Sequence, residues 1–234
     1  MKKIYAIILA MTLSCIAYGQ ISETLVDDNK LWSNLWQTAS GGPPPHEMVT
    51  THIKFSADTI IGDEVYKRVL ESTDENQTDF AVIGYIREDS LKKVYYRDKN
   101  ETESRLLYDF GAEVGDSIMI GDIVLVVETI DSVQINNEYL KRMELSHEGL
   151  VGEQWIEGIG SFCGILSSGY YGITGGKYDL LCFYENEALI YSNPEFENCF
   201  YNTVGIGESR CIAIIQNYIK YKYSKISYCH ISRC

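Results

Sequence analysis

The sequence predicts an all-β protein, an antiparallel meander of hairpins that forms a curled sheet or a sandwich-like pair of layers, with little helix. The first observation is the stretch 82–118, where short runs of aromatic and β-branched residues alternate with polar turns. Each run is too short for a helix and suits a pleated, half-buried surface. The second observation is that the same alternation continues on both sides of this stretch, so we expect the meander to set the fold.

The first elements in chain order are a strand candidate and a loop. Residues 30–37 could form a strand or one helical turn, because Trp32 and Trp36 share a face in either geometry. Residues 40–45 include three prolines, which fix φ and remove hydrogen-bond donors, so we expect a loop there. Strand-favouring residues resume at 49–55.

Two segments predict hairpins with the same residue pattern. Residues 58–69 and 131–143 both run Asp, hydroxyl residue, aliphatic, turn, aromatic, Lys-Arg, apolar. Either two hairpins of one sheet have similar surroundings, or the pattern records an ancient duplication. Residues 180–191 predict a further hairpin with its turn at Asn186.

The run Ile123–Val127 is the most continuous apolar stretch downstream of residue 20. An apolar strand without alternation is usually covered on both faces, so we expect this run at the centre of the core. Residues 155–161 predict a strand that leads into a glycine-rich turn, and residues 164–177 predict a long surface loop.

The N-terminus predicts a signal peptide over residues 1–19. A charged start, an apolar stretch over 4–13 and the small-x-small site at 17–19 follow the usual order. A lipoprotein with Cys15 acylated is the alternative, disfavoured because the residues before Cys15 make a poor lipobox. We therefore expect a chain that starts at Gln20 and is exported to the periplasm, cell surface or medium, with no transmembrane segment after cleavage.

We expect residues 20–209 to form a single β-rich domain and residues 210–234 to be an atypical tail, frameshifted or disordered. The tail has no Asp or Glu in 25 positions and no glycine or proline. A frameshift or early stop accounts for this composition. The competing interpretation is a genuine C-terminal element that docks by its Ile and Tyr residues and pairs Cys211, Cys229 and Cys234.

Charge excludes one class of partner. Residues 20–209 hold 13 basic and 33 acidic residues, a net charge of −20. Such a surface repels nucleic acid and anionic lipid at ordinary salt, so we do not expect nucleic-acid binding.

The cysteines predict a disulfide and no metal centre. Six remain after cleavage, without any CxxC spacing, so a zinc site is not expected, and no cofactor motif is present. Cys182 and Cys199 flank the hairpin 180–191, and we expect them to form a disulfide. Cys163 is left open, as a buried thiol or a further bridge.

Several motifs together resemble a family of uncharacterised secreted proteins of Bacteroidota that usually carry a C-terminal type IX secretion sorting domain. The motifs that carry the resemblance lie at 58–67, 84–89, 94–98, 106–116, 155–161 and 180–183. The resemblance implies export and a β-rich body. It supplies no active site, and the sorting domain itself is missing here.

Exported proteins of Bacteroidota are similar in carrying O-glycans on Asp-Ser/Thr followed by an aliphatic residue. On this basis the resemblance makes four hydroxyl residues O-glycosylation candidates: Thr59, Ser90, Ser117 and Ser132. The alternative is that each motif is a turn passing into a strand.

No catalytic motif stands out. The chain lacks Gly-x-Ser-x-Gly, and its four histidines are scattered, although Cys163 and His147 could still meet in space. Glu153 and Glu157, near Trp155, are the leading carboxylates for glycosidic chemistry, but a solvated strand face explains them more simply.

Binding has more support than catalysis. The chain has 18 tyrosines and 3 tryptophans, and the loop 164–178 combines glycines with Tyr170, Tyr171 and Tyr178 as a candidate binding loop. The alternative is that tyrosines alternate along strands to cover a thin core. The sequence thus favours a secreted or surface-exposed, non-catalytic β protein, an adhesive or glycan- or protein-binding module. The second hypothesis is a secreted hydrolase with a dispersed carboxylate site.

Overall fold

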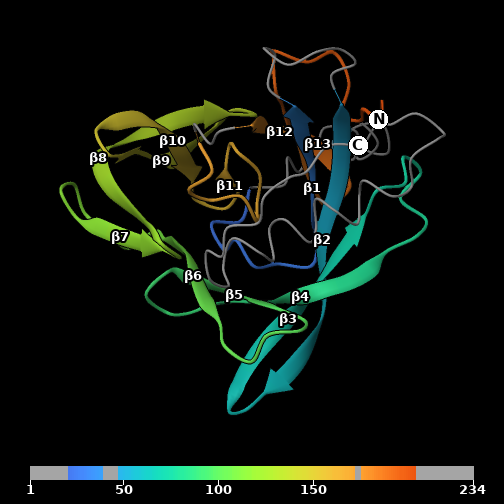
Figure 1. Ribbon diagram of the computed structural model, residues 1–234, viewed down its shortest axis with the longest axis horizontal. Coiled ribbons are helices and arrows are strands. Elements are labelled where there is room, and N and C mark those ends of the chain that lie inside the picture. Colours follow the sequence, from blue (N-terminus) through green and yellow to red (C-terminus); the bar gives the residue numbers. More distant parts are fainter. Residues whose placement is uncertain (1–20, 39–46, 172–174, 204–234) are drawn as a thin grey trace, which may run out of the picture.

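A computed structural model describes residues 21–38, 47–171 and 175–203 (Figure 1). These residues form two curled antiparallel sheets and contain no helix, so the all-β prediction is confirmed. Neither the predicted signal peptide, residues 1–19, nor the tail 210–234, with its three cysteines, belongs to the described residues. Among the residues that are described, no helix is long and apolar enough to cross a membrane.

The larger sheet has eight strands in the order β13-β12-β1-β2-β3-β4-β5-β6. Their bounds are β1 Lys30–Thr38, β2 Met48–Ile61, β3 Glu64–Ser72, β4 Ala81–Glu88, β5 Lys93–Asp98, β6 Arg105–Asp109, β12 Gly176–Glu185 and β13 Ala188–Ser192. The smaller sheet has the order β11-β10-β9-β8-β7. Its strands are β7 Ser117–Ile120, β8 Ile123–Ile135, β9 Glu138–His147, β10 Leu150–Ile156 and β11 Gly160–Ser161. In Figure 1 the smaller sheet lies on the left, and β1, β2 and β12 stand upright on the right.

The segment 30–37 is a strand, which settles the first alternative. Strand β1 lies between β12 and β2, where Trp32 is opposite Phe183 on one side and Ile53 on the other. Trp32 is completely buried, and its indole N–H donates to the carbonyl of Ile159 at 2.7 Å. The even spacing of the two tryptophans therefore reflects a strand face.

The three predicted hairpins are present as β2–β3, β8–β9 and β12–β13. The first two lie in different sheets, so a shared sheet does not explain their common pattern. Instead, each hairpin places its Asp directly opposite a cation, and the ion pairs Asp58–Lys67 and Asp131–Arg142 result. A cross-strand ion pair is thus the environment that the two hairpins share.

The prediction that Ile123–Val127 is covered on both faces is wrong. In β8, Leu125 and Val127 are buried, whereas Val124 is 41% exposed. Strand β8 pairs with β7 and β9 and shows alternating burial in this stretch, so one of its faces is open to solvent. Valine on the open face satisfies strand propensity without burial, and this hides the alternation in the sequence.

The core lies between the two sheets. Trp32, Phe55 and Phe183 enter it from the large sheet, and Trp155 enters from β10 of the small sheet. Tyr108 of β6 meets Trp155 edge-to-face, with ring centroids 5.1 Å apart. Contact between large aromatic side chains across the two layers makes one continuous core.

The segment before β1 is fastened by carboxylates from three different strands. The backbone N–H of Ile21 donates to Glu138 of β9, and the N–H of Ser22 donates to Glu185 of β12. Glu88 of β4 accepts from the next two N–H groups in the segment, those of residues 25 and 26. These bonds satisfy backbone donors that have no ladder partner.

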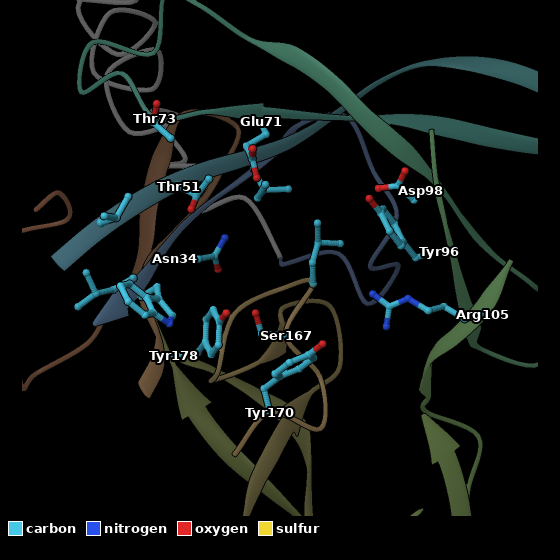
Figure 2. Close-up of a pocket in the computed structure, with 15 residues that line it drawn as sticks. Asn34, Thr51, Glu71, Thr73, Tyr96, Asp98, Arg105, Ser167, Tyr170 and Tyr178 are labelled. Atoms are coloured by element: carbon cyan, nitrogen blue, oxygen red, sulfur yellow. The ribbon is translucent and has the colours of Figure 1, made fainter. Parts of the chain in front are cut away.

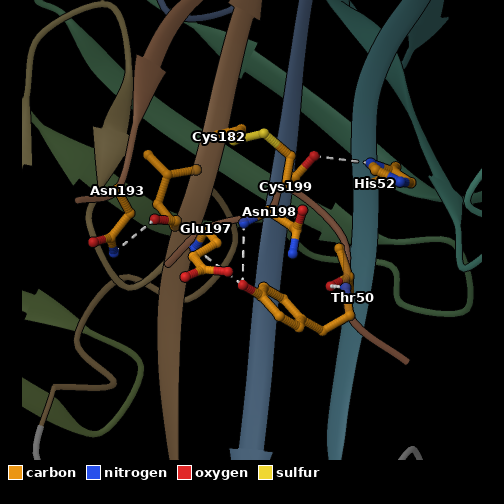
Figure 3. Close-up of a disulfide and its surroundings, with 10 residues drawn as sticks. Thr50, His52, Cys182, Asn193, Glu197, Asn198 and Cys199 are labelled. Carbon is orange, nitrogen blue, oxygen red and sulfur yellow. Dashed lines mark hydrogen bonds between the residues drawn. A yellow bond between two sulfur atoms is a disulfide. The ribbon is translucent and has the colours of Figure 1, made fainter. Parts of the chain in front are cut away.

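The chain after β13 crosses the outer face of β1 and β2 (Figure 3). Cys182 and Cys199 form a disulfide with their Cα atoms 5.4 Å apart, the pair expected from the sequence. The backbone N–H of Thr50 donates to the carbonyl of Tyr201, the N–H of Tyr201 donates to the Thr50 hydroxyl, and Phe200 stacks on His52. We call residues 193–203 the C-terminal arm.

Candidate functional site

The inner face of the large sheet changes character along its strands. Its middle is apolar, with Trp32, Phe55, Val69, Ile86, Val94 and Leu107 all buried. Toward one end, polar side chains replace the apolar ones on the same strands. These polar residues are Asn34 on β1, Thr51 on β2, Glu71 on β3, Asp98 on β5 and Arg105 on β6. A polar set on an inward face is informative, because inward positions are normally apolar.

These side chains line a cavity of about 340 Å³, which we call the inner cavity (Figure 2). In Figure 2 the Glu71 carboxyl points into it from one side, and Ser167, Tyr170 and Tyr178 face it from the opposite side. The Arg105 guanidinium points toward its centre from a third side. The remaining lining is largely apolar and includes Trp36, Val49, Ile53 and Leu166.

Glu71 is the carboxylate that β3 contributes to the inner cavity. It pairs with Ile53 in the β2–β3 register, and this places it on the inner face. Burial raises the pKa of the Glu71 carboxyl, and the charge of Lys99 offsets part of this rise. A carboxyl in such a position takes up a proton more readily than an exposed one.

Tyr96 and Arg105 form one end of the inner cavity. The guanidinium lies 5.4 Å from the centroid of the Tyr96 ring, and burial raises the pKa of the Tyr96 hydroxyl. Tyr96 donates to the carbonyl of Ile83 at 3.3 Å. A Cβ at Gly84 would lie 2.5 Å from the Tyr96 hydroxyl oxygen, so the ring position depends on this glycine.

The prediction of a surface loop over 164–177 is only partly right. Ile165 and Ser168 are buried, and Tyr178 belongs to strand β12, not to a loop. Asn34 fixes the start of the segment by accepting from the N–H of Ile165 at 3.3 Å. Gly164 has φ = 105°, and a Cβ there would lie 2.7 Å from the side-chain amide oxygen Oδ1 of Asn34. Only glycine meets both conditions without strain.

The candidate binding tyrosines do come together. Tyr170 and Tyr178 meet edge-to-face with ring centroids 5.6 Å apart, and both line the inner cavity. They also line a second hollow of about 540 Å³, the outer cleft, where the half-exposed Tyr171 joins them. Phe162 stacks on Tyr191 in the outer cleft, with ring centroids 5.2 Å apart. The tyrosine pair therefore separates two hollows.

The solvated-face interpretation of Glu153 and Glu157 is wrong, because both side chains are buried. Glu153 accepts from the Ser161 hydroxyl at 2.6 Å and from the Trp155 indole at 3.0 Å, and burial raises the pKa of its carboxyl. Glu157 pairs with Lys92. Neither carboxylate lines the inner cavity or the outer cleft, so they make no carboxylate pair there.

Cys163 and His147 have different partners. Cys163 lines the outer cleft, its backbone N–H donates to Ser161, and burial raises the pKa of its thiol. His147 instead has Nδ1 3.0 Å from the carbonyl oxygen of Val124. Cys163 is a free, buried thiol, which is one of the two alternatives left open. In the described part of the chain, no group of three or more His, Cys, Asp and Glu side chains could hold a metal ion.

The four O-glycosylation candidates lie on or beside hairpins. Ser90, Ser117 and Ser132 are exposed, and Thr59 is half-buried on β2. Their glycosylation stays a prediction.

Sequence reasoning missed Glu71, Asp98 and Arg105. The one available signal was the alternation along β3. Glu71 comes two residues after the apolar Val69, so both side chains lie on the same face of the strand. Comparisons with known proteins add no relative: no family model matches the chain, and neither a curated protein nor a solved structure matches it.

Proposed function

We propose that this protein binds a saccharide non-catalytically in the inner cavity. The carrying observation is the convergence of hydroxyl, amide, carboxyl and guanidinium groups from β1, β2, β3, β5 and β6 on one hollow with aromatic and aliphatic walls. A sugar presents hydroxyl groups at its edge and apolar C–H faces, so it needs this combination. A few converging polar groups in a mostly apolar hollow are typical of small-molecule sites.

The surroundings of the inner cavity support binding by a preformed site. Thr51 and Asn34 lie on central strands, and Asn34 also holds the segment that carries Tyr170. The disulfide fastens the C-terminal arm across the outer face of the same strands. Side chains on rigid strands lose little entropy when a ligand binds, and this favours affinity.

The protein acts outside the cytoplasm in this proposal. The disulfide is compatible with an oxidising compartment, and the signal-like N-terminus and the family resemblance point the same way. A glycan of the cell surface or of the surroundings is then the expected partner.

One observation favours hydrolysis as the second candidate. Glu71 and Asp98 line the same cavity, and the pKa of Glu71 is raised. Glycoside hydrolysis uses a pair of carboxyl groups, one of which keeps its proton and acts as the general acid. The experiment below separates the two candidates.

The test is a glycan array with the purified protein, followed by calorimetric titration with each saccharide that binds. Thr51→Val removes one cavity hydroxyl while keeping the shape of the side chain, and losing one neutral hydrogen bond should weaken binding about fivefold. Thr59→Val, on the same strand but outside the cavity, is the matched control and should bind like the wild type.

Two results would contradict the proposal. One is equal affinity of the Thr51→Val variant and the wild type for every saccharide bound, which would place binding elsewhere. The other is the release of new reducing ends from a bound oligosaccharide, lost in Glu71→Gln, which would establish the hydrolase instead.

A further inference from the structure

We propose that the inner cavity selects a cationic amino sugar, of the glucosamine type, by pairing its ammonium group with Glu71. This inference rests on the proposed saccharide binding and names the chemical class of the ligand. The pairing also couples ligand binding to proton release, because it favours the ionised form of the Glu71 carboxyl.

The geometry around Glu71 suits an ammonium group. The carboxyl points into the hollow from β3, and the rings of Trp36, Tyr170 and Tyr178 line the same space. Aromatic faces attract cations, with the largest effect where water is excluded. A carboxylate together with aromatic walls is therefore a cation site and not merely a polar one.

The opposite end of the cavity suits oxygen atoms. The Arg105 guanidinium is oriented by the Tyr96 ring and points toward the centre of the cavity. It offers N–H donors only, whereas Asp98, which lines the same cavity, accepts from hydroxyl groups. An amino sugar carries its ammonium group on one carbon and its hydroxyl and ring oxygens on the neighbouring carbons. It can therefore meet Glu71 and Arg105 at the same time.

The charged and titratable groups that surround Glu71 come from β5, β6, the segment 166–170, β12 and the turn after β5. They are Asp98, Tyr96, Arg105, Tyr170, Tyr178 and Lys99. The charge of Lys99 favours the ionised form of Glu71, and yet burial outweighs it and keeps the pKa of Glu71 raised. A ligand cation in contact with the carboxyl supplies the stabilisation that the ionised form lacks.

The proton consequence follows from linkage. In the empty site the pKa of Glu71 is raised above its ordinary value of 4.5, and the ligand ammonium lowers it again. Binding therefore releases protons at pH values around and above 4.5, and affinity rises with pH through this range until Glu71 is ionised in the free protein as well.

The experiment uses isothermal titration calorimetry with two probes of equal length, a glucosamine tetrasaccharide and its N-acetylated counterpart, in two buffers of different ionisation enthalpy. The expected result is at least tenfold tighter binding of the glucosamine form, with proton release. Glu71→Gln should abolish both the preference and the proton release. Glu101→Gln, an exposed residue of the β5–β6 turn, is the matched control and should retain both.

The outcomes separate this inference from the proposed function. Binding of neither probe, nor of any saccharide on the array, would overturn both. Equal binding of the two probes without proton exchange would overturn the ammonium pairing and leave saccharide binding standing. Because the protein is strongly acidic, tetralysine serves as a charge control. If tetralysine binds to both the wild type and Glu71→Gln as tightly as the glucosamine probe does, nonspecific attraction of cations to the acidic protein explains the binding. The inference is then wrong.

Discussion

Lys30 shows how single residues hold this fold together. Its side chain is completely buried on β1, and Nζ donates to the carbonyls of Ser22, Thr24 and Gly158 at 2.9, 2.6 and 2.9 Å. The Glu185 carboxylate lies 3.5 Å away and is buried too. Burial lowers the pKa of Lys30, and Glu185 counteracts part of that shift. The pair therefore ties the N-terminal segment to both sheets.

We predict that Lys30→Met destabilises the protein by about 3–5 kcal/mol, because it leaves Glu185 as an unpaired buried charge. The double variant Lys30→Met/Glu185→Gln should recover part of this loss. Lys67→Met, which breaks a more exposed pair, should cost less than about 1 kcal/mol. Denaturant unfolding measures all three, and a Lys30→Met effect as small as that of Lys67→Met would refute the role of the pair.

His52 makes stability depend on pH. Its ring is buried, lies 3.0 Å from the Ser33 hydroxyl and stacks on Phe200 of the C-terminal arm. Burial lowers the pKa of His52 below 6.5, with a smaller opposite effect from Asp74. The unfolded chain therefore binds the proton first, and stability is lost as pH falls through 6.5 toward the lower folded value.

We predict that the unfolding free energy of the wild type falls relative to that of His52→Gln as pH is lowered from 7.5 to 5. The partly buried Glu71 and Glu88 and the buried Glu153 have raised pKa values and act in the opposite direction, so the difference between the two proteins isolates His52. Unfolding free energies at several pH values provide the measurement. Parallel pH curves for the two proteins would show that His52 contributes nothing.

At the scale of elements, β8 is the clearest test of alternation. We predict that Leu125→Asp costs several kcal/mol, because it buries an unpaired charge, while Val124→Asp on the exposed face costs little. Both variants lie in the same strand, so they share any effect on strand propensity. Comparable decreases in the unfolding temperatures of the two variants would mean that both faces of β8 are covered after all.

Elements could be predicted from the sequence further than the site could. Strands and hairpins depend on local alternation and turn residues, such as the two positive-φ residues Asn136 and Asn137. The tyrosine pair was predictable because glycines and tyrosines cluster within one short segment. The cavity acids and Arg105 were not, because their side chains meet only through the register of strands far apart in the chain, such as Ile53 opposite Glu71.

At the scale of the whole molecule, the two sheets share one apolar core, and one end of the large sheet is left polar. The polar end includes β1 and β2, strands that the C-terminal arm and the disulfide brace from the outer face. Stability and binding therefore depend on different residues, and variants of the polar cavity side chains should leave the core intact. It also leaves one tryptophan, Trp36, at the cavity, while Trp32 and Trp155 are completely buried in the core.

The most direct test of saccharide binding in the inner cavity is tryptophan fluorescence during titration with the saccharides found on the array. Because Trp36 lines the cavity and the other two tryptophans of the chain are shielded, we predict a saturable change in emission for the wild type. Trp36→Phe should keep the emission of the core tryptophans and lose the change. Binding that leaves the wild-type emission unaltered, or a change that persists in Trp36→Phe, would contradict the account.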